Sequence, residues 1–158
     1  MRQEFEGHCQ CGAVAYRVTG VTATLFACHC TECQRQSSSA FGMALWVMEP
    51  SVEFVSGEVK EWIRTMPSGR RMSCKFCLDC GTRLFHTTLG QTQILSIKPG
   101  TLRDTSQLMP VGHIWVDSKQ KWFQIENDTL QYPGNPESFD DLICAWSTVN
   151  EAVRTSSN

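Results

Sequence analysis

The 158-residue sequence lacks any long hydrophobic run, and no stretch approaches the length needed to span a bilayer. It also lacks a charge excess, because 14 basic and 16 acidic side chains give a net charge of −2. Basic residues are scattered apart from the pair Arg70-Arg71, so we expect neither a nucleic-acid partner nor a membrane partner. The N-terminal residues are polar and contain no apolar signal core, which predicts a cytoplasmic protein.

Cysteine, in contrast, is abundant: the chain has nine, at positions 9, 11, 28, 30, 33, 74, 77, 80 and 144. In a reducing compartment, clustered cysteines are more often metal ligands or reactive thiols than disulfides. The alternative is a secreted domain held together by disulfides. An odd cysteine count, the missing signal core and a hydrophobic fraction of 41% weigh against that alternative.

Short strand-like segments separated by turn signals predict a mainly β fold. They cover residues 13–18, 41–48, 52–55, 59–63, 70–76, 84–87 and 93–97. One helix is expected over about 136–150, with Asn135 as its cap and Pro136 in its first turn. An apolar stripe at helical spacing should dock this helix on the sheet: Phe139, Leu142, Ile143, Trp146 and Val149. The chain length fits a single domain over residues 1–158.

Two cysteine pairs have the spacing of a structural metal site. Two thiolates close in sequence can bind one ion from a single turn, and a following glycine relieves that turn. Both Cys77-Leu78-Asp79-Cys80-Gly81 and Cys9-Gln10-Cys11-Gly12 have this form. Together they predict a four-thiolate zinc site that ties the N-terminal hairpin to the middle of the chain and stabilises the fold.

The middle cluster, Cys28-His29-Cys30-Thr31-Glu32-Cys33, offers three thiolates. Three protein ligands leave a tetrahedral metal with one open position, as in catalytic zinc sites, and sulfur ligands select zinc over magnesium or calcium. A substrate thiol entering that position would be deprotonated and become a nucleophile. Four thiolates around Zn²⁺ carry a net charge of −2 and three carry −1, so the second site accepts a further anion more readily.

The sequence leaves other ligand sets open. Cys74-x-x-Cys77 also has ligand spacing, although Cys77 with Cys80 is preferred because a glycine follows Cys80. Cys74 instead alternates with apolar residues as a core residue would. Alternatively, both zinc sites are closed and structural, with Cys74 or His29 completing the second. Cys144, beside the helical stripe, is expected to be a packing cysteine.

The cysteine clusters and their surroundings resemble the glutathione-dependent formaldehyde-activating enzymes, the family that includes centromere protein V. The resemblance spans roughly residues 5–125 and rests on five segments in the same order: Gly7–Tyr16, Cys28–Ser37, Phe76–Leu84, Ile97–Leu102 and Pro110–Trp115. It implies a β-tent fold of stacked antiparallel sheets and the same two zinc sites as the spacing. One departure concerns Ser37-Ser38-Ser39, where members often have Ser-Gly-Ser, and this puts the shape of the substrate pocket in question.

The resemblance further implies a carbon–sulfur lyase reaction in which glutathione adds to formaldehyde to give S-(hydroxymethyl)glutathione. It implies two zinc ions per chain, glutathione as co-substrate, and formaldehyde or a related aldehyde as the other small molecule. Arg35, Arg83 and Lys98 are candidates for binding the glutathione carboxylates. The alternatives are a non-catalytic zinc-binding interaction module and a zinc buffer.

Three other polar residues lie near these motifs. His29 and Glu32 flank the ligand Cys30, and we expect each to be a solvent-facing or outer-shell group. His113, beside Trp115, could line a pocket but is equally explained as a core histidine with satisfied hydrogen bonds.

Overall fold

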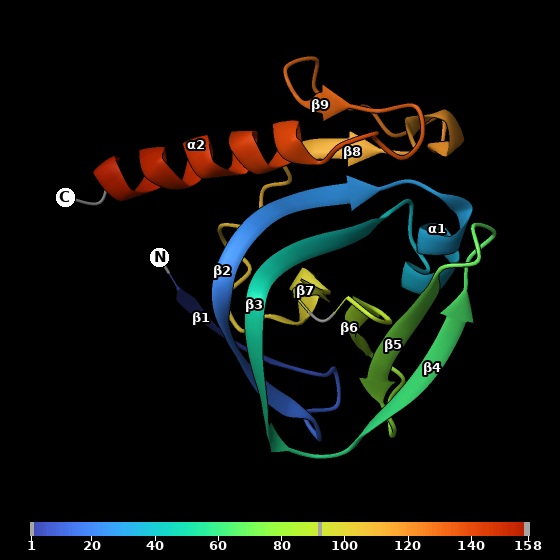
Figure 1. Cartoon of the computed structure of the whole chain (residues 1–158), viewed down its shortest axis with the longest axis vertical. Helices are drawn as coiled ribbons and strands as arrows, with labels where there is room; N and C mark the ends of the chain where they lie inside the picture. Colours follow the sequence, from blue (N-terminus) through green and yellow to red (C-terminus); the bar gives the residue numbers. More distant parts are fainter. Residues whose placement is uncertain (1, 92, 157–158) are drawn as a thin grey trace. The chain divides into compact units, whose positions relative to one another are not determined.

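The structure, a computed structural model, describes residues 2–91 and 93–156. These residues form nine β-strands and two α-helices, one of them C-terminal, which confirms the mainly β class (Figure 1). The chain divides into two compact units, which are described separately below. Unit 1 comprises Met1–Thr22 and Leu45–Gln107, and unit 2 comprises Ala23–Ala44 and Leu108–Asn158. The single domain expected over residues 1–158 stays a prediction.

The strands are hydrogen-bonded in the order β4-β5-β6-β7-β3-β2-β8-β9, and β1 also pairs with β2. Their bounds are β1 Gln3–His8, β2 Ala15–Cys28, β3 Gly42–Ser56, β4 Val59–Thr65, β5 Arg71–Cys77, β6 Arg83–Thr88, β7 Ile94–Ile97, β8 Gly112–Ile114 and β9 Leu130–Gln131. The pairs β2–β8 and β8–β9 are parallel, whereas β1–β2 and the pairs from β4 to β7 and on to β3 are antiparallel. The sheet is therefore mixed.

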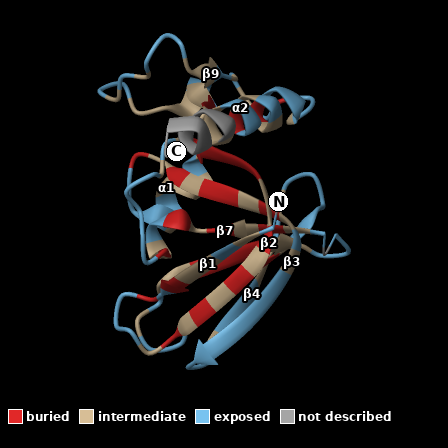
Figure 2. Ribbon diagram, turned by 90° about the vertical axis from the view of Figure 1, so that its left-hand side faces the viewer, coloured by how far each residue is buried: buried red, intermediate tan, exposed pale blue. Residues whose placement is uncertain are grey.

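In unit 1, β4 to β7 form a continuous antiparallel ladder that β3 joins through residues 45–48, drawn from teal to yellow in Figure 1. Its core includes Tyr16, whose ring meets that of Phe85 edge-on with 4.7 Å between centroids. The Tyr16 hydroxyl hydrogen-bonds the Thr101 hydroxyl at 2.7 Å. Gly7 permits this arrangement, because a Cβ at that position would collide with the tyrosine ring and hydroxyl. The second half of β3 is mostly exposed, as Figure 2 shows in pale blue.

Unit 2 contains the end of β2, the short helix α1 (Thr31–Ser37), strands β8 and β9, and the C-terminal helix α2 (Asp140–Ser156). The predicted stripe of α2 faces inward, with Leu142 and Trp146 buried. Leu142 packs where Gly112 leaves room, and its carbonyl accepts a hydrogen bond from the Thr24 hydroxyl at 3.0 Å. These contacts fix α2 on β2 and β8.

The start of α2 differs from the prediction of a helix over about 136–150. The helix begins at Asp140, whose N–H donates to the Ser138 hydroxyl at 3.1 Å, and it continues to Ser156. The predicted cap Asn135 instead donates its side-chain amide to the Pro136 carbonyl. A serine turn thus competes with the asparagine–proline signal and moves the helix start four residues along.

Candidate functional site

The four-cysteine cluster (Cys9, Cys11, Cys77 and Cys80) lies in unit 1, where two turns bring its members together. Its thiol sulfurs all lie within 4.8 Å of one another. Cys11 Sγ is 3.5 Å from Cys9 Sγ and 3.9 Å from Cys77 Sγ. Zinc bonds to sulfur of about 2.3 Å in a tetrahedron place the sulfurs about 3.8 Å apart, so the thiols fit a zinc ion. Gly12 and Gly81, at φ 79° and 73°, give both turns the left-handed backbone they need.

Hydrogen bonds in these turns favour ionised sulfur. The Val14 N–H donates to Cys9 Sγ at 3.2 Å, and the Thr82 hydroxyl lies 3.1 Å from Cys80 Sγ. Burial acts to raise the pKa of Cys9, yet the Val14 N–H and the thiols of Cys11 and Cys77 lower it overall. The Thr82 hydroxyl and backbone N–H lower the pKa of Cys80 to about 5. Thiolate is the form that binds zinc, so these hydrogen bonds prepare Cys9 and Cys80 for a metal. The backbone at Ala13 acts to lower the pKa of Cys11, but the neighbouring thiols raise it to about 12.

Cys74 and Cys144 lie outside the groups of clustered ligand atoms found among the described residues. Cys74 is fully buried on β5, with its thiol 3.9 Å from the Met72 carbonyl oxygen, as expected of a core residue. Cys144 is exposed, so the expectation of a packing cysteine there is wrong. The buried stripe passes through Leu142 and Trp146 on either side of residue 144 in the sequence, and Cys144 lies outside it on the exposed part of α2.

The three-cysteine cluster (Cys28, Cys30 and Cys33) lies in unit 2, at the end of β2 and the start of α1. The three sulfurs lie within 4.8 Å of one another. Cys30 caps α1, and its sulfur accepts a hydrogen bond from the Cys33 N–H at 3.3 Å. Cys28 is buried, whereas Cys30 and Cys33 are partly exposed. The cluster is therefore anchored on one side and accessible on the other.

The three thiols share their protons unequally. Hydrogen bonds from Cys28 and Cys33 lower the pKa of Cys30 to about 2, and the same interaction raises the pKa of Cys28. The thiolate form is thus concentrated on Cys30, at the cap of α1, where the backbone N–H groups of Glu32 and Cys33 also favour it. Three sulfurs of this kind form a donor set that fits zinc and leaves one tetrahedral position for another ligand.

His29, between two of these cysteines, does not join their sulfurs. Its ring is fully buried, and its Nε2 lies 2.8 Å from Nδ1 of His113, which is also buried. The rings of Phe41 and Phe123 surround the pair, with centroids 5.3 and 5.4 Å from the His29 ring. Burial first, and then the nearby charge of His113 and Lys119, lowers the pKa of His29 to about 4. His113 is therefore a buried histidine paired with His29.

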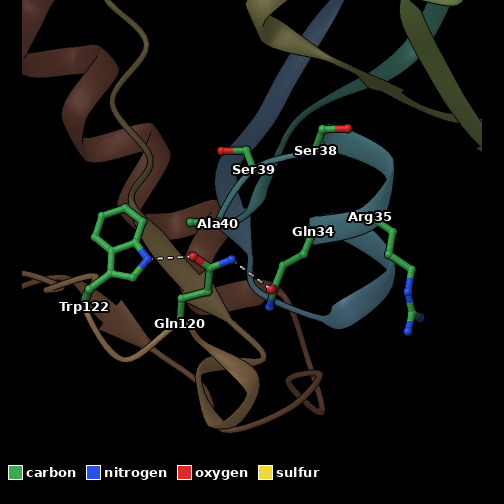
Figure 3. A pocket seen from close by; sticks show the side chains of 7 residues that line it. All are labelled: Gln34, Arg35, Ser38, Ser39, Ala40, Gln120 and Trp122. Carbon is green, nitrogen blue, oxygen red and sulfur yellow. Dashed lines mark hydrogen bonds between the residues drawn. The ribbon is translucent and has the colours of Figure 1, made fainter.

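The backbone of His29 is held by a chain of side-chain amides. Gln34 Nε2 donates to the His29 carbonyl at 2.7 Å and to the Ser118 carbonyl at 2.9 Å. Gln120 Nε2 donates to Gln34 Oε1 at 3.3 Å, and Trp122 Nε1 donates to Gln120 Oε1 at 2.6 Å, as Figure 3 shows. The loop that carries Cys28 and Cys30 is thus connected to an exposed tryptophan.

An open cavity of about 560 Å³ lies along this amide chain, beside α1 (Figure 3). Its lining consists of Gln34, Arg35, Ser38, Ser39, Ala40, Gln120 and Trp122. Ser38 ends α1 with φ 51° and ψ 37°, the left-handed conformation that glycine adopts most readily. The serine at this position therefore keeps the backbone shape of a glycine and adds a hydroxyl to the cavity.

The three predicted carboxylate-binding residues fall in different units. Arg35 lines the cavity of unit 2 and forms an ion pair with Glu32, Nη1 to Oε1 2.6 Å. Arg83 and Lys98 belong to unit 1, where both act electrostatically on the buried His86. Sequence reasoning did not identify His86, nor the amides of Gln34 and Gln120. The alternation of side chains in the strand around residue 86 could have indicated a histidine on the inner face. No sequence pattern marks the two glutamines.

Comparison with known proteins gives these features a context. The sequence profile of the glutathione-dependent formaldehyde-activating enzyme family matches residues 4–118. The chain belongs to this family. The family indicated by the cysteine motifs is therefore confirmed, and it suggests a glutathione-related, lyase-type function.

Two further proteins are similar to this chain. An uncharacterized lyase of Schizosaccharomyces pombe is 23% identical over 129 residues, covering 82% of this chain and 90% of that protein. The crystal structure of a Rhodobacter sphaeroides protein has a TM-score of 0.52 at 20% identity, covering 65% of this chain and 91% of that one. The latter likeness concerns the fold alone. Among the described residues, no helix has the length and apolar character required to cross a membrane.

Proposed function

We propose that the protein is a zinc-dependent enzyme of the carbon–sulfur lyase type, acting on glutathione and formaldehyde or a related aldehyde. The observation that carries this proposal is the three-cysteine cluster of Cys28, Cys30 and Cys33. Two of its cysteines are partly exposed, and it has one ligand fewer than the four of a closed zinc site. Membership of a family named for this reaction supports it.

In this proposal the two clusters have different roles. Cys9, Cys11, Cys77 and Cys80 hold a structural zinc, and Cys28, Cys30 and Cys33 hold a second, reactive zinc. Bound there, zinc would supply Lewis-acid chemistry that favours the thiolate form of a substrate thiol at neutral pH. The fully buried His29, paired with His113, would fix the chain between the ligands Cys28 and Cys30.

The overall reaction conserves atoms. A carbon–sulfur bond forms between the glutathione sulfur and the aldehyde carbon, the carbonyl π bond breaks, and the thiol proton ends on the former carbonyl oxygen. The chain's contribution is to bring sulfur and carbon together and to lower the pKa of the thiol. Glu32, expected to face solvent or the outer shell, is partly exposed and paired with Arg35.

The cavity beside α1 is the proposed site for the peptide part of the thiol substrate. It lies on the helix that carries Cys33, and it offers the Ser38 and Ser39 hydroxyls and the exposed face of Trp122. Arg35 lies at the margin of the cavity, and its ion pair with Glu32 would be replaced by an ion pair with a carboxylate of the substrate. A peptide needs such a combination of hydrogen-bonding groups and apolar surface.

A titration of the cobalt-substituted protein with glutathione tests the proposal. Glutathione should change the cobalt–sulfur charge-transfer and ligand-field bands saturably, because its thiol completes the coordination of the three-cysteine site. Cys30→Ser should abolish that change, while Cys74→Ala, outside both clusters, should preserve it. An absence of spectral change with both sites loaded would contradict the proposal and favour a closed site in an interaction module or a zinc store.

A further inference from the structure

Unit 1 contains a buried histidine at the centre of one sheet face. His86 of β6 is 8% exposed, and it pairs in register with Cys74 of β5 and Ser96 of β7. Trp62 of β4 in turn pairs with Cys74. Residues paired across neighbouring strands lie on the same face of a sheet. Trp62, Cys74, His86 and Ser96 therefore form one row across four strands.

Two basic residues extend this row. Arg64 follows Trp62 by two positions, and Lys98 follows Ser96 by two. Because side chains alternate along extended chain, both lie on the face of His86. The backbone N–H of Lys98 donates to the Leu84 carbonyl at 2.8 Å, which keeps the end of β7 beside β6.

A third basic residue reaches this face through an irregularity in the sheet. Arg83 and Phe85 would both lie on the opposite face from His86 in a regular strand. The register of β5 and β6 shifts between Lys75 and Phe76, however, so that Phe76 pairs with Arg83. Phe76 shares the face of the central row, and the bulge therefore turns Arg83 toward His86.

The contacts of Arg83 hold its guanidinium in place. Nη1 lies 3.3 Å from His86 Nε2, and because arginine only donates, this histidine nitrogen is the acceptor. The guanidinium carbon lies 5.6 Å from the ring centroid of Trp62 and 5.7 Å from that of Phe76. These cation–π contacts restrict the arginine, so less conformational entropy is lost when it binds a ligand.

Positive charge dominates at this place. Burial lowers the pKa of His86 to about 2, with further lowering from the charges of Lys98, Arg83 and Arg64. Burial raises the pKa of the Cys74 thiol, whereas the same three charges act to lower it. The histidine stays neutral, and the cations around it favour any anion that arrives.

From this arrangement we infer that Arg64, Arg83 and Lys98, gathered around His86, form a binding site for the carboxylate group of a small molecule. Arg83 supplies a planar fork matched to a carboxylate, and Trp62, half exposed beside it, supplies apolar contact for the rest of the ligand. This inference rests on the proposed function only for its choice of probe. The same chemistry would also receive a phosphate.

S-Methylglutathione is a suitable probe, because it keeps both carboxylates but has no free thiol, and it is used on the Arg35→Met background, which removes the carboxylate contact proposed beside α1. Its dissociation constant should be measured calorimetrically on the full-length, zinc-loaded protein. Arg83→Met should raise it by about tenfold or more, and Lys98→Met by several-fold. Lys75→Met is the matched control, since Lys75 lies on the same strand as Cys74 but at the alternate position, and it should leave the affinity unchanged. Arg83→Lys, which keeps the charge without the fork, should give an intermediate affinity.

Further arms separate this inference from the proposed function. Cys30→Ser should leave S-methylglutathione binding intact even where the cobalt response to glutathione is lost, and the diester of the probe should bind weakly. Succinate or inorganic phosphate that binds and is lost in Arg83→Met would support the anion site even if glutathione is not the substrate. Equal binding in wild type, Arg83→Met and Lys98→Met would overturn the inference, as would no binding of any of these anions.

Discussion

The side-chain amide of Gln34 donates a hydrogen bond of 2.7 Å to the carbonyl of His29, the residue between Cys28 and Cys30. Gln34 lies on α1 with Cys33, so one side chain couples the helix to the loop that carries the other two thiols. Groups that orient metal ligands in this way commonly change metal affinity by one to two orders of magnitude.

Gln34→Ala should therefore weaken zinc binding by the three-cysteine cluster. The expected loss is about tenfold or more in affinity, measured by competition with a chromogenic chelator. The free energy of unfolding should fall by about 1–2 kcal/mol because the Ser118 carbonyl also loses its donor. Gln36→Ala, two positions along the same helix, should change neither quantity. Unchanged zinc affinity in Gln34→Ala would show that the loop keeps its shape without the amide.

Cys80→Ser should affect the stability of the fold, whereas Cys30→Ser should affect turnover. Cys80→Ser removes a ligand of the proposed structural zinc, so it should release one zinc ion and strongly lower the melting temperature. Cys30→Ser should abolish turnover and leave the fold intact. Turnover is measured by exchange NMR of the glutathione–formaldehyde adduct. Cys74→Ala should keep both zinc ions, because its thiol belongs to neither cluster. Equal unfolding of Cys80→Ser and Cys30→Ser would contradict the division into structural and reactive sites.

Ser38→Gly should stabilise the protein. Ser38 has φ 51°, and a left-handed backbone is strained for a residue with a Cβ but not for glycine. Relief of that strain, less the extra entropy of glycine in the unfolded chain, should add about 0.5–1 kcal/mol to the free energy of unfolding in urea. Ser39→Gly, at the next position, should bring no such gain. A destabilised Ser38→Gly variant would mean that the serine hydroxyl, and not the backbone, matters here.

The sequence predicted what local spacing controls and missed what depends on distant contacts. Both cysteine groups could be read from spacing, because ligands on one turn must be close in sequence. The strands predicted at 41–48 and 52–55 are one strand, β3, since the chain passes Pro50 with Glu49 in a left-handed conformation and continues. No local rule anticipates that outcome, because the neighbouring strand decides whether pairing resumes.

The cations of unit 1 illustrate the same limit. The sequence marks Arg83 and Lys98 only as isolated charges and does not single out Arg64. The register of four strands and one bulge is needed to place them on a common face. The predicted start of α2 was wrong for the opposite reason. Two local signals compete there, and the turn at Ser138, not Asn135, determines where the helix begins.

Tyr16 should make stability depend on alkaline pH. Burial raises the pKa of its hydroxyl from 10.0 to about 12. The folded state keeps this proton in a range where the unfolded state loses it, so stability present below pH 10 is lost as the pH rises toward 12. The loss attributable to Tyr16 should reach roughly 2–3 kcal/mol.

Tyr16→Phe isolates this contribution. Near neutral pH the variant should be less stable by about 1 kcal/mol, because the hydrogen bond to Thr101 is gone. Above pH 10 the wild type should lose stability faster than the variant, so the two unfolding free energies should converge and then cross. Thr148→Ala, which removes an exposed hydroxyl from α2, serves as the control and should keep a constant offset from wild type. Parallel curves for wild type and Tyr16→Phe across this range would show that the tyrosine ionises as easily in the folded protein as in the unfolded chain.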